Sequence, residues 1–334
     1  MKAILLGDNP PPMAAYSNAT LAAIRVECEM LSTAILRKSD VLDGAARDAG
    51  AIFSSWGMPS FIAEEIAAFL PNAKAVFYAA GSVQSFAHPF LSSGVRVFSA
   101  WRENAVPVAE FAVSQILLAN KGFFQACRMN RSAKAHLEAH RLFSAYPGNF
   151  DCRVGLLGCG SIGRLVAEEL RRHRLEVLVF DPFLPDEAAS SLGVRKASLE
   201  EIFATCQTVS NHLANNERTK GMLDWSLFSK MPRNATFINT GRGAQVVEAD
   251  LVRALAEEPG RTAVLDVTCP EPPEEGSPFY SMPNVFLTPH MAGSSGLEIR
   301  RMGEAMLEEW RAWNADPSSR SVREVTPKML ETMA

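Results

Sequence analysis

The chain has 334 residues, of which 47% are hydrophobic and 21% charged, a composition typical of a folded globular protein. This length accommodates two ordinary domains, each with its own core. The net charge of -4 excludes the strongly basic surface that grips nucleic acid, and the apolar run at residues 3–6 is too short for a secretory signal or a membrane span. We therefore expect neither a nucleic-acid nor a membrane partner.

The six cysteines form no C-x-x-C pair and no cluster with histidine. This spacing predicts neither a zinc site nor a disulfide framework, so we expect no metal and a reducing, cytoplasmic location.

Short β-rich apolar runs alternate with amphipathic stretches, which is the pattern of a parallel sheet flanked by helices. A helix is predicted over residues 60–70, where Pro71 ends it. The first hundred residues are predicted to form a small α/β unit. Its predicted strands are residues 3–6, 34–36, 51–53, 75–78 and 95–98.

A long helix-like stretch covers about residues 105–126, and a polar segment with four basic residues and two histidines follows, up to residue 141. Residues 146–151 (YPGNFD) predict a turn. The last predicted helix, about residues 295–313, precedes a polar tail. Between the turn and that helix, strands are predicted at residues 153–157, 177–180, 208–211, 236–239, 263–266 and 285–287.

The sharpest motif is RVGLLGCGSIG at residues 153–163, where an apolar strand runs into Gly158-x-Gly160-x-x-Gly163 and a helix follows. These glycines allow a tight turn, a close backbone approach to a diphosphate and close helix–strand packing. A plain strand–turn–helix corner would also explain them. However, the next strand ends at Asp181, 181 − 160 = 21 residues after the middle glycine, where a carboxylate binds ribose hydroxyls and repels a 2′-phosphate. The motif therefore predicts dinucleotide binding, with NAD favoured over NADP.

Three further segments follow predicted strands of the second half, where ligands bind in such sheets. FINTGRG contains Arg242, LDVTCPEPP contains Asp266 and Glu271, and LTPHMAG contains His290. A guanidinium can hold a carboxylate and polarise the adjacent carbonyl, and a histidine oriented by a carboxylate can exchange a proton near neutral pH. Singly, these residues could be a surface cation, a solvated acid and a structural histidine. Together, behind a dinucleotide motif, they indicate reduction of a 2-oxo acid.

With these motifs the sequence resembles the D-2-hydroxyacid dehydrogenase family over about residues 76–296. The resemblance also covers NAVPVAEFAVSQILLANK at residues 104–121, ERTKGML at 217–223 and INTGRGAQVVEADLVRAL at 238–255. Several motifs in the family's order make the resemblance specific.

The resemblance implies an α/β protein of two Rossmann or flavodoxin-like domains with parallel sheets. A NAD-binding domain at residues 102–293 would be inserted in a discontinuous substrate domain, residues 1–101 plus 294–334. It also implies a homodimer built on the region 104–145.

By the same resemblance, Arg242 would bind the carboxylate and carbonyl of the substrate, His290 would be the acid/base, and Glu271 would hold its ring. The implied substrate-binding residues are Ala80, Gly81, Trp56, Trp101 and Arg102. The implied cofactor-binding residues are Gly158, Cys159, Gly160, Ser161, Ile162, Gly163, Asp181, Val108, His212, Thr240, Gly241, Asp266, Ala292 and Gly293.

The sequence departs from the family pattern at the substrate loop, where AAGSV at residues 79–83 stands in place of G-x-G-x-D. The usual proline after H-x is also absent from the segment that begins at His212. Trp101 and Arg102 would suit an aromatic or additionally acidic substrate, or would simply pack and face water. The departures leave the identity of the 2-oxo acid open.

The leading hypothesis is therefore a NAD(H)-dependent oxidoreductase that interconverts a 2-oxo acid and a D-2-hydroxy acid. One alternative is a NAD-binding scaffold similar to the C-terminal-binding-protein corepressors. Another is a Rossmann enzyme that acts on secondary alcohols without a carboxylate, for which Arg242 would be dispensable.

Overall fold

The computed structural model describes residues 1–8 and 14–330 and divides into two compact units, each built on one sheet. The first unit comprises residues 1–105 and the segment from Ser294, and the second comprises residues 106–293. The predicted substrate domain includes residues 9–13 and 331–334, which lie outside the described residues. The predicted α/β class with two mainly parallel sheets is confirmed. No helix among the described residues is long and apolar enough to cross a membrane.

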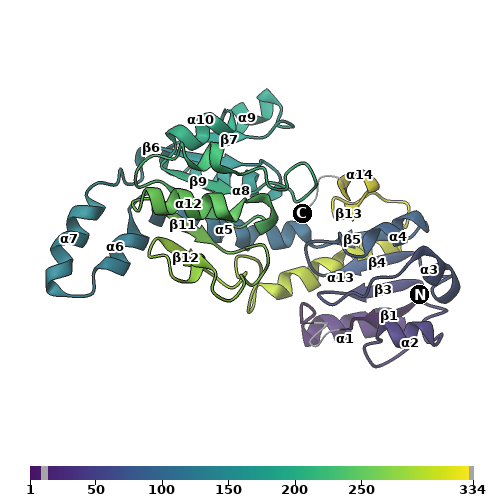
Figure 1. Ribbon diagram of the computed structural model, residues 1–334. Helices are drawn as coiled ribbons and strands as arrows, with labels where there is room; N and C mark the ends of the chain where they lie inside the picture. The colour runs from purple at the N-terminus through teal and green to yellow at the C-terminus, as the bar shows by residue number, and fades with distance from the viewer. Residues whose placement is uncertain (9–13, 331–334) are drawn as a thin grey trace. The chain divides into compact units, whose positions relative to one another are not determined.

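The first unit contains a six-stranded sheet in the order β13-β5-β4-β3-β1-β2, parallel except for β13 (Figure 1). Its strands are β1 (Lys2–Leu6), β2 (Glu29–Met30), β3 (Ala51–Ser54), β4 (Ala75–Tyr78), β5 (Arg96–Ser99) and β13 (Glu324–Val325). Its helices are α1 (Asn18–Glu27), α2 (Lys38–Leu42), α3 (Ala63–Phe69), α4 (Ala87–Ser92), α13 (Ile299–Ala315) and α14 (Pro327–Leu330). Helix α5 (Trp101–Ala119) begins in this unit and continues into the next.

Helices cover both faces of this sheet, and successive side chains of each strand point to opposite sides, so both sets of side chains are buried. Ala3 and Leu5 pack against α1 and α13, whose Trp310 ring meets Phe53 at 5.8 Å between centroids. Ile4 of the same strand packs on the other face, against α2, α3 and α4. Strands covered on both faces are continuous apolar runs in the sequence, which explains why β1, β3, β4 and β5 were predicted.

The second unit contains a seven-stranded, all-parallel sheet in the order β12-β11-β10-β9-β6-β7-β8. Its strands are β6 (Phe150–Leu157), β7 (Arg174–Phe180), β8 (Arg195–Lys196), β9 (Thr208–Asn211), β10 (Thr236–Asn239), β11 (Thr262–Leu265) and β12 (Val285–Leu287). Its remaining elements are α6 (Phe123–Met129), α7 (Ala133–Phe143), α8 (Ser161–Leu170), α9 (Asp186–Leu192), α10 (Leu199–Thr205), α11 (Trp225–Phe228), α12 (Glu248–Glu257), η1 (Gly243–Gln245) and η2 (Pro278–Tyr280).

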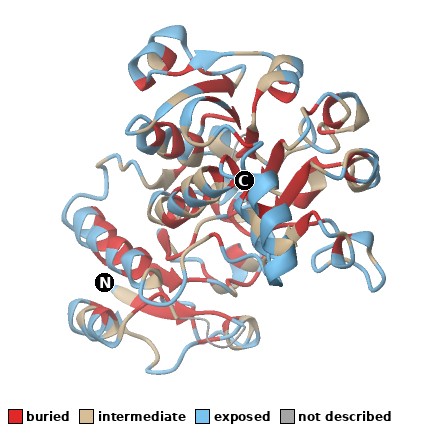
Figure 2. Cartoon of the chain, turned by 90° about the vertical axis from the view of Figure 1, so that its left-hand side faces the viewer, coloured by how far each residue is buried: buried red, intermediate tan, exposed pale blue. Residues whose placement is uncertain are grey.

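Helices cover both faces of this sheet as well. Residues of α5, α8 and α9 share one core cluster with the strands, and residues of α10, α11 and α12 share the other. Figure 2 shows the strands as mostly buried and the outer helix faces as exposed. The chain builds β6, β7 and β8 outward in one direction and then returns to place β9 on the other side of β6. Ligands bind at such a reversal of strand order, beyond the carboxyl ends of the strands.

The single long helix predicted over about residues 105–126 is wrong. Helix α5 ends at Ala119, Gly122 has a left-handed φ of 66°, and α6 begins after it. A Cβ at Gly122 would collide with the ring of Tyr146, so this close tertiary contact accompanies the break. The polar segment that follows is mostly helical, as α7, whose N-cap Ser132 accepts a hydrogen bond from the N–H of Ala135.

One other local prediction is also wrong, and one segment contains more structure than its sequence indicated. Of the strand predicted over residues 34–36, only Leu36 forms a bridge, to Leu6, and the sheet instead ends at β2. The expected polar tail contributes β13 and α14. Arg96 fixes this tail by donating hydrogen bonds to Glu324 and to the carbonyl oxygen of Ser319. Such pairing over more than two hundred residues has no local sequence pattern.

Candidate functional site

The glycine turn lies at the carboxyl end of β6, next to the reversal of strand order. Gly158 has a φ of 91°, and a Cβ there would lie 2.6 Å from the carbonyl oxygen of His212. A Cβ at Gly163 would collide with the carbonyl oxygen of Gly158, whereas a Cβ at Gly160 would meet no atom within 4 Å. The first and third glycines are thus required by packing, and the space above the second is open.

Helix α8 begins directly after this turn, with Gly160 as its N-cap and no capping side chain. The first N–H groups of a helix have no partner within it, and the helix dipole favours an anion at this end. Ser161 and Ile162 occupy the first two positions of the helix. The turn therefore provides an uncapped site for a diphosphate.

Asp181 lies beside the turn, just after β7. Its Oδ2 accepts a hydrogen bond from the N–H of Cys159 at 2.7 Å, and its Oδ1 accepts one from the N–H of Phe183 at 2.8 Å. A carboxylate can accept about four hydrogen bonds, so acceptor capacity remains on both oxygens. This geometry suits recognition of vicinal hydroxyls.

Two buried polar atoms at the ends of neighbouring strands have no hydrogen-bond partner among the described residues: Nδ1 of His212 and Oγ1 of Thr240. His212 follows β9 and is 8% exposed, and its Nε2 lies 3.0 Å from Oγ of Ser210. Burial lowers the pKa of His212 to about 4, so the ring is neutral near neutral pH. These two atoms are available to form hydrogen bonds with a polar ligand, and a dinucleotide fits this requirement.

Arg242 follows β10 and is partly buried. Its Nη1 donates to the carbonyl oxygen of Gly241 at 2.8 Å, and no carboxylate of the described residues lies within 4.0 Å of its guanidinium. Burial lowers the pKa of Arg242, while the charge of Glu271 acts in the opposite direction. A partly desolvated guanidinium without a paired carboxylate is suited to bind an anionic ligand.

His290 and Glu271 form a direct pair, with 2.6 Å between Nδ1 of the ring and Oε1 of the carboxylate. His290 follows β12 with a left-handed φ of 53°, a conformation that histidine adopts more readily than most residues. Both side chains are more than 40% exposed, so the pair is accessible. Glu271 thus contacts His290 and acts electrostatically on Arg242, which places the three predicted residues in one region of the second unit.

Asp266 has a structural role that sequence reasoning missed. It is 3% exposed, its Oδ1 accepts from Oγ1 of Thr288 at 2.6 Å and from the N–H of Met291 at 2.8 Å, and its Oδ2 accepts from the N–H of Ala292 at 2.9 Å. These bonds fix the loop on both sides of His290. Nothing in the sequence of the β11 end indicates this pairing, because the partners are 22–26 residues away.

The remaining predicted cofactor residues of the second unit lie along the same loops or are buried in the core. Gly241 lies between Thr240 and Arg242, Gly293 follows Ala292, and Val108 is a buried residue of α5 with 6% exposure. Groups of three or more histidine, cysteine or acidic side chains that could hold a metal ion are not found in the described part of the chain.

In the first unit, the predicted substrate residues follow the carboxyl ends of three adjacent strands, β3, β4 and β5. Trp56 follows β3 and is 42% exposed. Ala80 and Gly81 follow β4, and Oγ of Ser99 lies 2.9 and 2.7 Å from their carbonyl oxygens. The other two residues, Trp101 and Arg102, begin α5, with the guanidinium carbon 5.5 Å from the indole centroid.

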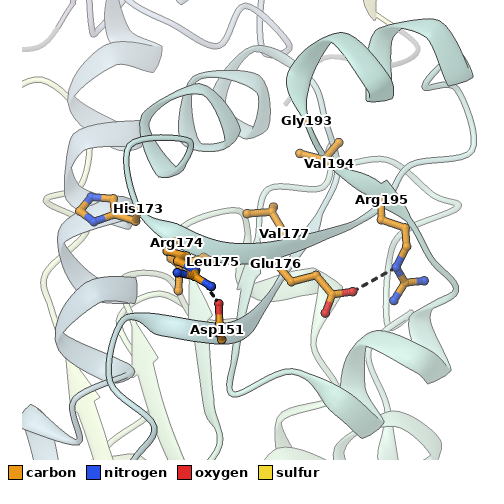
Figure 3. Close-up of a pocket in the computed structure, with 9 residues that line it drawn as sticks. All are labelled: Asp151, His173, Arg174, Leu175, Glu176, Val177, Gly193, Val194 and Arg195. Atoms are coloured by element: carbon orange, nitrogen blue, oxygen red, sulfur yellow. Dashed lines mark hydrogen bonds and ion pairs between the residues drawn. The ribbon is translucent and has the colours of Figure 1, made fainter.

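A separate hollow of about 770 Å³ lies at the start of β7, at the opposite edge of the seven-stranded sheet from the glycine turn (Figure 3). Its charged groups are paired with one another: Arg174 with Asp151 at 3.0 Å and Arg195 with Glu176 at 3.3 Å. None of the predicted site residues lines it. The charges that line the hollow are thus paired within the protein, whereas Arg242 has no carboxylate partner among the described residues.

Comparison with known proteins identifies related sequences and folds. Residues 113–292, more than half of the chain, match the model of the D-isomer specific 2-hydroxyacid dehydrogenase NAD-binding domain. A D-3-phosphoglycerate dehydrogenase of Mycobacterium tuberculosis is 31% identical over 218 residues, which are 65% of this chain and 40% of that protein. The chain spans less than two thirds of the length of the curated relatives that it matches first.

Solved structures share the fold at lower identity. The apo form of D-mandelate dehydrogenase from Rhodotorula graminis has a TM-score of 0.80 at 18% identity, covering 97% of both chains. A NAD complex of a D-isomer specific 2-hydroxyacid dehydrogenase from Lactobacillus delbrueckii ssp. bulgaricus has a TM-score of 0.74 at 20% identity, covering 98% of this chain and 100% of that one.

Proposed function

This chain belongs to the D-isomer specific 2-hydroxyacid dehydrogenase family, and we propose that it interconverts a 2-oxo acid and a D-2-hydroxy acid. The match to the family's NAD-binding domain gives NAD as the cofactor. The observation that carries the proposal is the grouping of the His290–Glu271 pair with the guanidinium of Arg242, which has no paired carboxylate in the described ranges 1–8 and 14–330.

In this proposal the glycine turn and the uncapped end of α8 hold the diphosphate of NAD, and Asp181 holds a ribose. His212 and Thr240 offer their unpartnered atoms to the same cofactor. Bound NAD supplies a hydride acceptor or donor at its nicotinamide ring.

Arg242 binds the carboxylate of the substrate and polarises its carbonyl group. Nδ1 of His290 is occupied by Glu271, so Nε2 is the nitrogen that gives a proton to the carbonyl oxygen during reduction and removes it during oxidation. Glu271 orients the ring and stabilises its cationic form. No additional acid or base is needed for this proton transfer.

We assign substrate contacts in the first unit to the main-chain N–H groups of Ala80 and Gly81, and to the side chains of Trp56, Trp101 and Arg102. Ser99 supports this assignment because its hydroxyl contacts both carbonyl oxygens of the Ala80–Gly81 pair. Arg102 makes a cation–π contact with Trp101 and forms no ion pair with a described residue, so it favours a substrate with an aromatic or second acidic group.

We also propose a homodimer in which a second copy covers the α6–α7 hairpin. Leu137 and Phe143 of α7 are 63% and 41% exposed, and Phe123 of α6 is 45% exposed. Figure 1 shows this hairpin standing out from the sheet of its own unit. Exposed apolar side chains gathered on one hairpin are typical of a surface that another chain covers.

The decisive experiment mixes the purified protein with NADH and each member of a panel of 2-oxo acids, and follows the nicotinamide absorbance. We expect at least one acid to cause loss of NADH, and the D enantiomer of the product to support the reverse reaction with NAD. A parallel series with NADPH should show weaker binding because Asp181 repels a 2′-phosphate.

NADH binding without consumption by any acid would contradict the proposal and favour a NAD-binding scaffold. Oxidation of secondary alcohols that lack a carboxylate, with full activity retained in Arg242→Lys, would favour a Rossmann enzyme that does not recognise a carboxylate.

A further inference from the structure

Three buried side-chain amides form a network next to the loop that carries Arg242. Asn211 and Asn239 are the last residues of β9 and β10 and are register partners in the sheet. Gln245 is the last residue of η1, the turn that follows Arg242. All three amides are at most 1% exposed, so each unmet hydrogen bond would be costly.

The network holds the peptide groups on both sides of Arg242. Oε1 of Gln245 accepts from the N–H of Arg242 at 3.2 Å, and Nδ2 of Asn239 donates to its carbonyl oxygen at 3.2 Å. Oδ1 of Asn239 also accepts from the N–H of Gly241 at 3.0 Å. Because a peptide N–H can only donate and a carbonyl can only accept, these partners fix the orientation of both amides.

The same amides connect this loop to the loop after β9. Nδ2 of Asn211 donates to Oε1 of Gln245 at 2.6 Å and to Oδ1 of Asn239 at 2.9 Å. Nε2 of Gln245 donates to the carbonyl oxygens of Leu213 and Ala214, both at 2.9 Å. Gln245 thus uses both acceptor positions and both N–H groups, and no atom of its amide is free to accommodate movement.

The backbone around the arginine also has little room to shift. A Cβ at Gly241 would lie 2.9 Å from Nδ2 of Asn211 and 2.9 Å from Oε1 of Gln245. A Cβ at Gly243 would collide with the main chain of Thr268. The glycines on both sides of the arginine therefore allow the network and the neighbouring loop to approach closely.

We propose that Gln245 is a positioning residue that fixes the main chain of Arg242 and thereby aims its guanidinium at the carboxylate of the substrate. The inference rests on the proposed function. Within the described part of the chain, the guanidinium makes one hydrogen bond, to the carbonyl oxygen of Gly241, so its position depends on where the main chain holds it. Displacement of a substrate-binding group by about 1 Å can cost about 10²-fold in rate.

The test is a double-mutant cycle with a matched control. Gln245→Leu, Arg242→Lys and the double variant are compared with the wild type for kcat, KM and amide hydrogen exchange. Gln207→Leu is the control. Gln207 lies just before β9, and its Nε2 donates to the carbonyl oxygen of Asn234, before β10, at 2.6 Å. This bond is therefore at the amino ends of the two strands, away from Gln245. Gln207→Leu removes one side-chain hydrogen bond before β9 and β10, whereas Gln245→Leu removes four beyond the carboxyl ends of the same two strands.

We expect Gln245→Leu to lower kcat/KM for the acid by about 10²-fold in the wild type and by less than about threefold when Arg242 is already lysine. Amide exchange should accelerate in the peptide that contains Arg242. Gln207→Leu should leave kcat/KM and that exchange unchanged.

If Gln245→Leu lowers kcat/KM by the same factor with arginine and with lysine at position 242, or if it keeps full activity, Gln245 does not position Arg242. The proposed function would remain intact. Unchanged amide hydrogen exchange around Arg242 in Gln245→Leu would also overturn the positioning role, and this measurement does not depend on catalysis. A wild-type protein that reduces no 2-oxo acid would remove the proposed function and this inference together.

Discussion

The amino and carboxyl ends of the parallel strands form two opposite edges of the seven-stranded sheet, here called the amino edge and the carboxyl edge. The two edges differ in how their polar groups are satisfied. At the amino edge, Arg174 and Arg195 each pair with a carboxylate in the hollow of Figure 3. At the carboxyl edge, Arg242 has no paired carboxylate, and His212 and Thr240 each carry a buried atom without a partner among the described residues. Charges satisfied within the protein leave little interaction free energy for a ligand, so the difference supports our proposal that ligands bind at the carboxyl edge.

The largest effect should follow from changing His290. Asparagine tolerates the left-handed backbone at this position, so His290→Asn removes the proton-transfer group with little strain. We expect turnover to fall by about 10²- to 10⁴-fold, since that is the usual contribution of a positioned acid/base. NADH binding, measured by fluorescence titration, serves as the control and should not change. Full turnover in this variant would remove His290 from the mechanism.

Arg242→Lys should have the next largest effect. Lysine keeps the charge but loses the planar fork that binds a carboxylate through two hydrogen bonds. We expect kcat/KM for the 2-oxo acid to fall by about 10- to 100-fold, since a hydrogen bond to a charged group contributes about 1.5–3 kcal/mol. Steady-state kinetics over a range of acid concentrations measures the loss, and an unchanged KM and kcat would mean that the carboxylate binds elsewhere.

The buried His212 should make the free energy of unfolding depend on pH. Its pKa of about 4 lies below the ordinary histidine value of about 6.5, so the unfolded chain takes up a proton first as the pH falls. The contribution of neutral His212 to stability is present above about pH 6.5 and is lost progressively towards pH 4. Between pH 7 and pH 5 the free energy of unfolding should decrease by about 2 kcal/mol. Urea unfolding at both pH values measures this loss.

The matched variant for this prediction is His212→Asn, which does not titrate in that range. It should show a smaller loss of unfolding free energy between pH 7 and pH 5 than the wild type. Identical losses in the two proteins would show that other groups cause the pH dependence.

The smallest effect should come from the amino edge. Asp151→Asn removes the ion pair with Arg174, and asparagine accepts the positive φ of this position. Exposed ion pairs contribute about 1 kcal/mol or less, so the unfolding free energy should change little and kcat/KM should remain the same. A loss of activity in this variant would show that the hollow takes part in function, and the contrast between the edges would no longer hold.

The sequence predicted the family, the two sheets and the glycine turn because these depend on local patterns. Buried parallel strands are continuous apolar runs, and the glycine spacing is a local motif, although Gly158 is required by a contact with His212 after the neighbouring strand β9. The comparisons confirm the family, and the two mainly parallel sheets confirm the predicted fold class. The roles of the individual site residues remain predictions.

Other features depend on partners that are distant in the chain. The break before α6 involves contact between Gly122 and Tyr146, and the C-terminal strand β13 pairs with β5 more than two hundred residues earlier. A local window contains neither partner, so the same residues read there as a continuous helix and a polar tail.

By itself, the amino-acid sequence determined, to within one residue, where the strands that precede the candidate site end and which reactive side chains follow them, since apolar runs and glycine spacing encode both. Only the tertiary structure decided that Asp266 fixes the loop of His290, and that Gln245 joins the Arg242 loop to the loop after β9. These amide and carboxylate bonds form between residues brought together by parallel pairing of strands. Their strength comes from burial, which no single segment of the chain can provide.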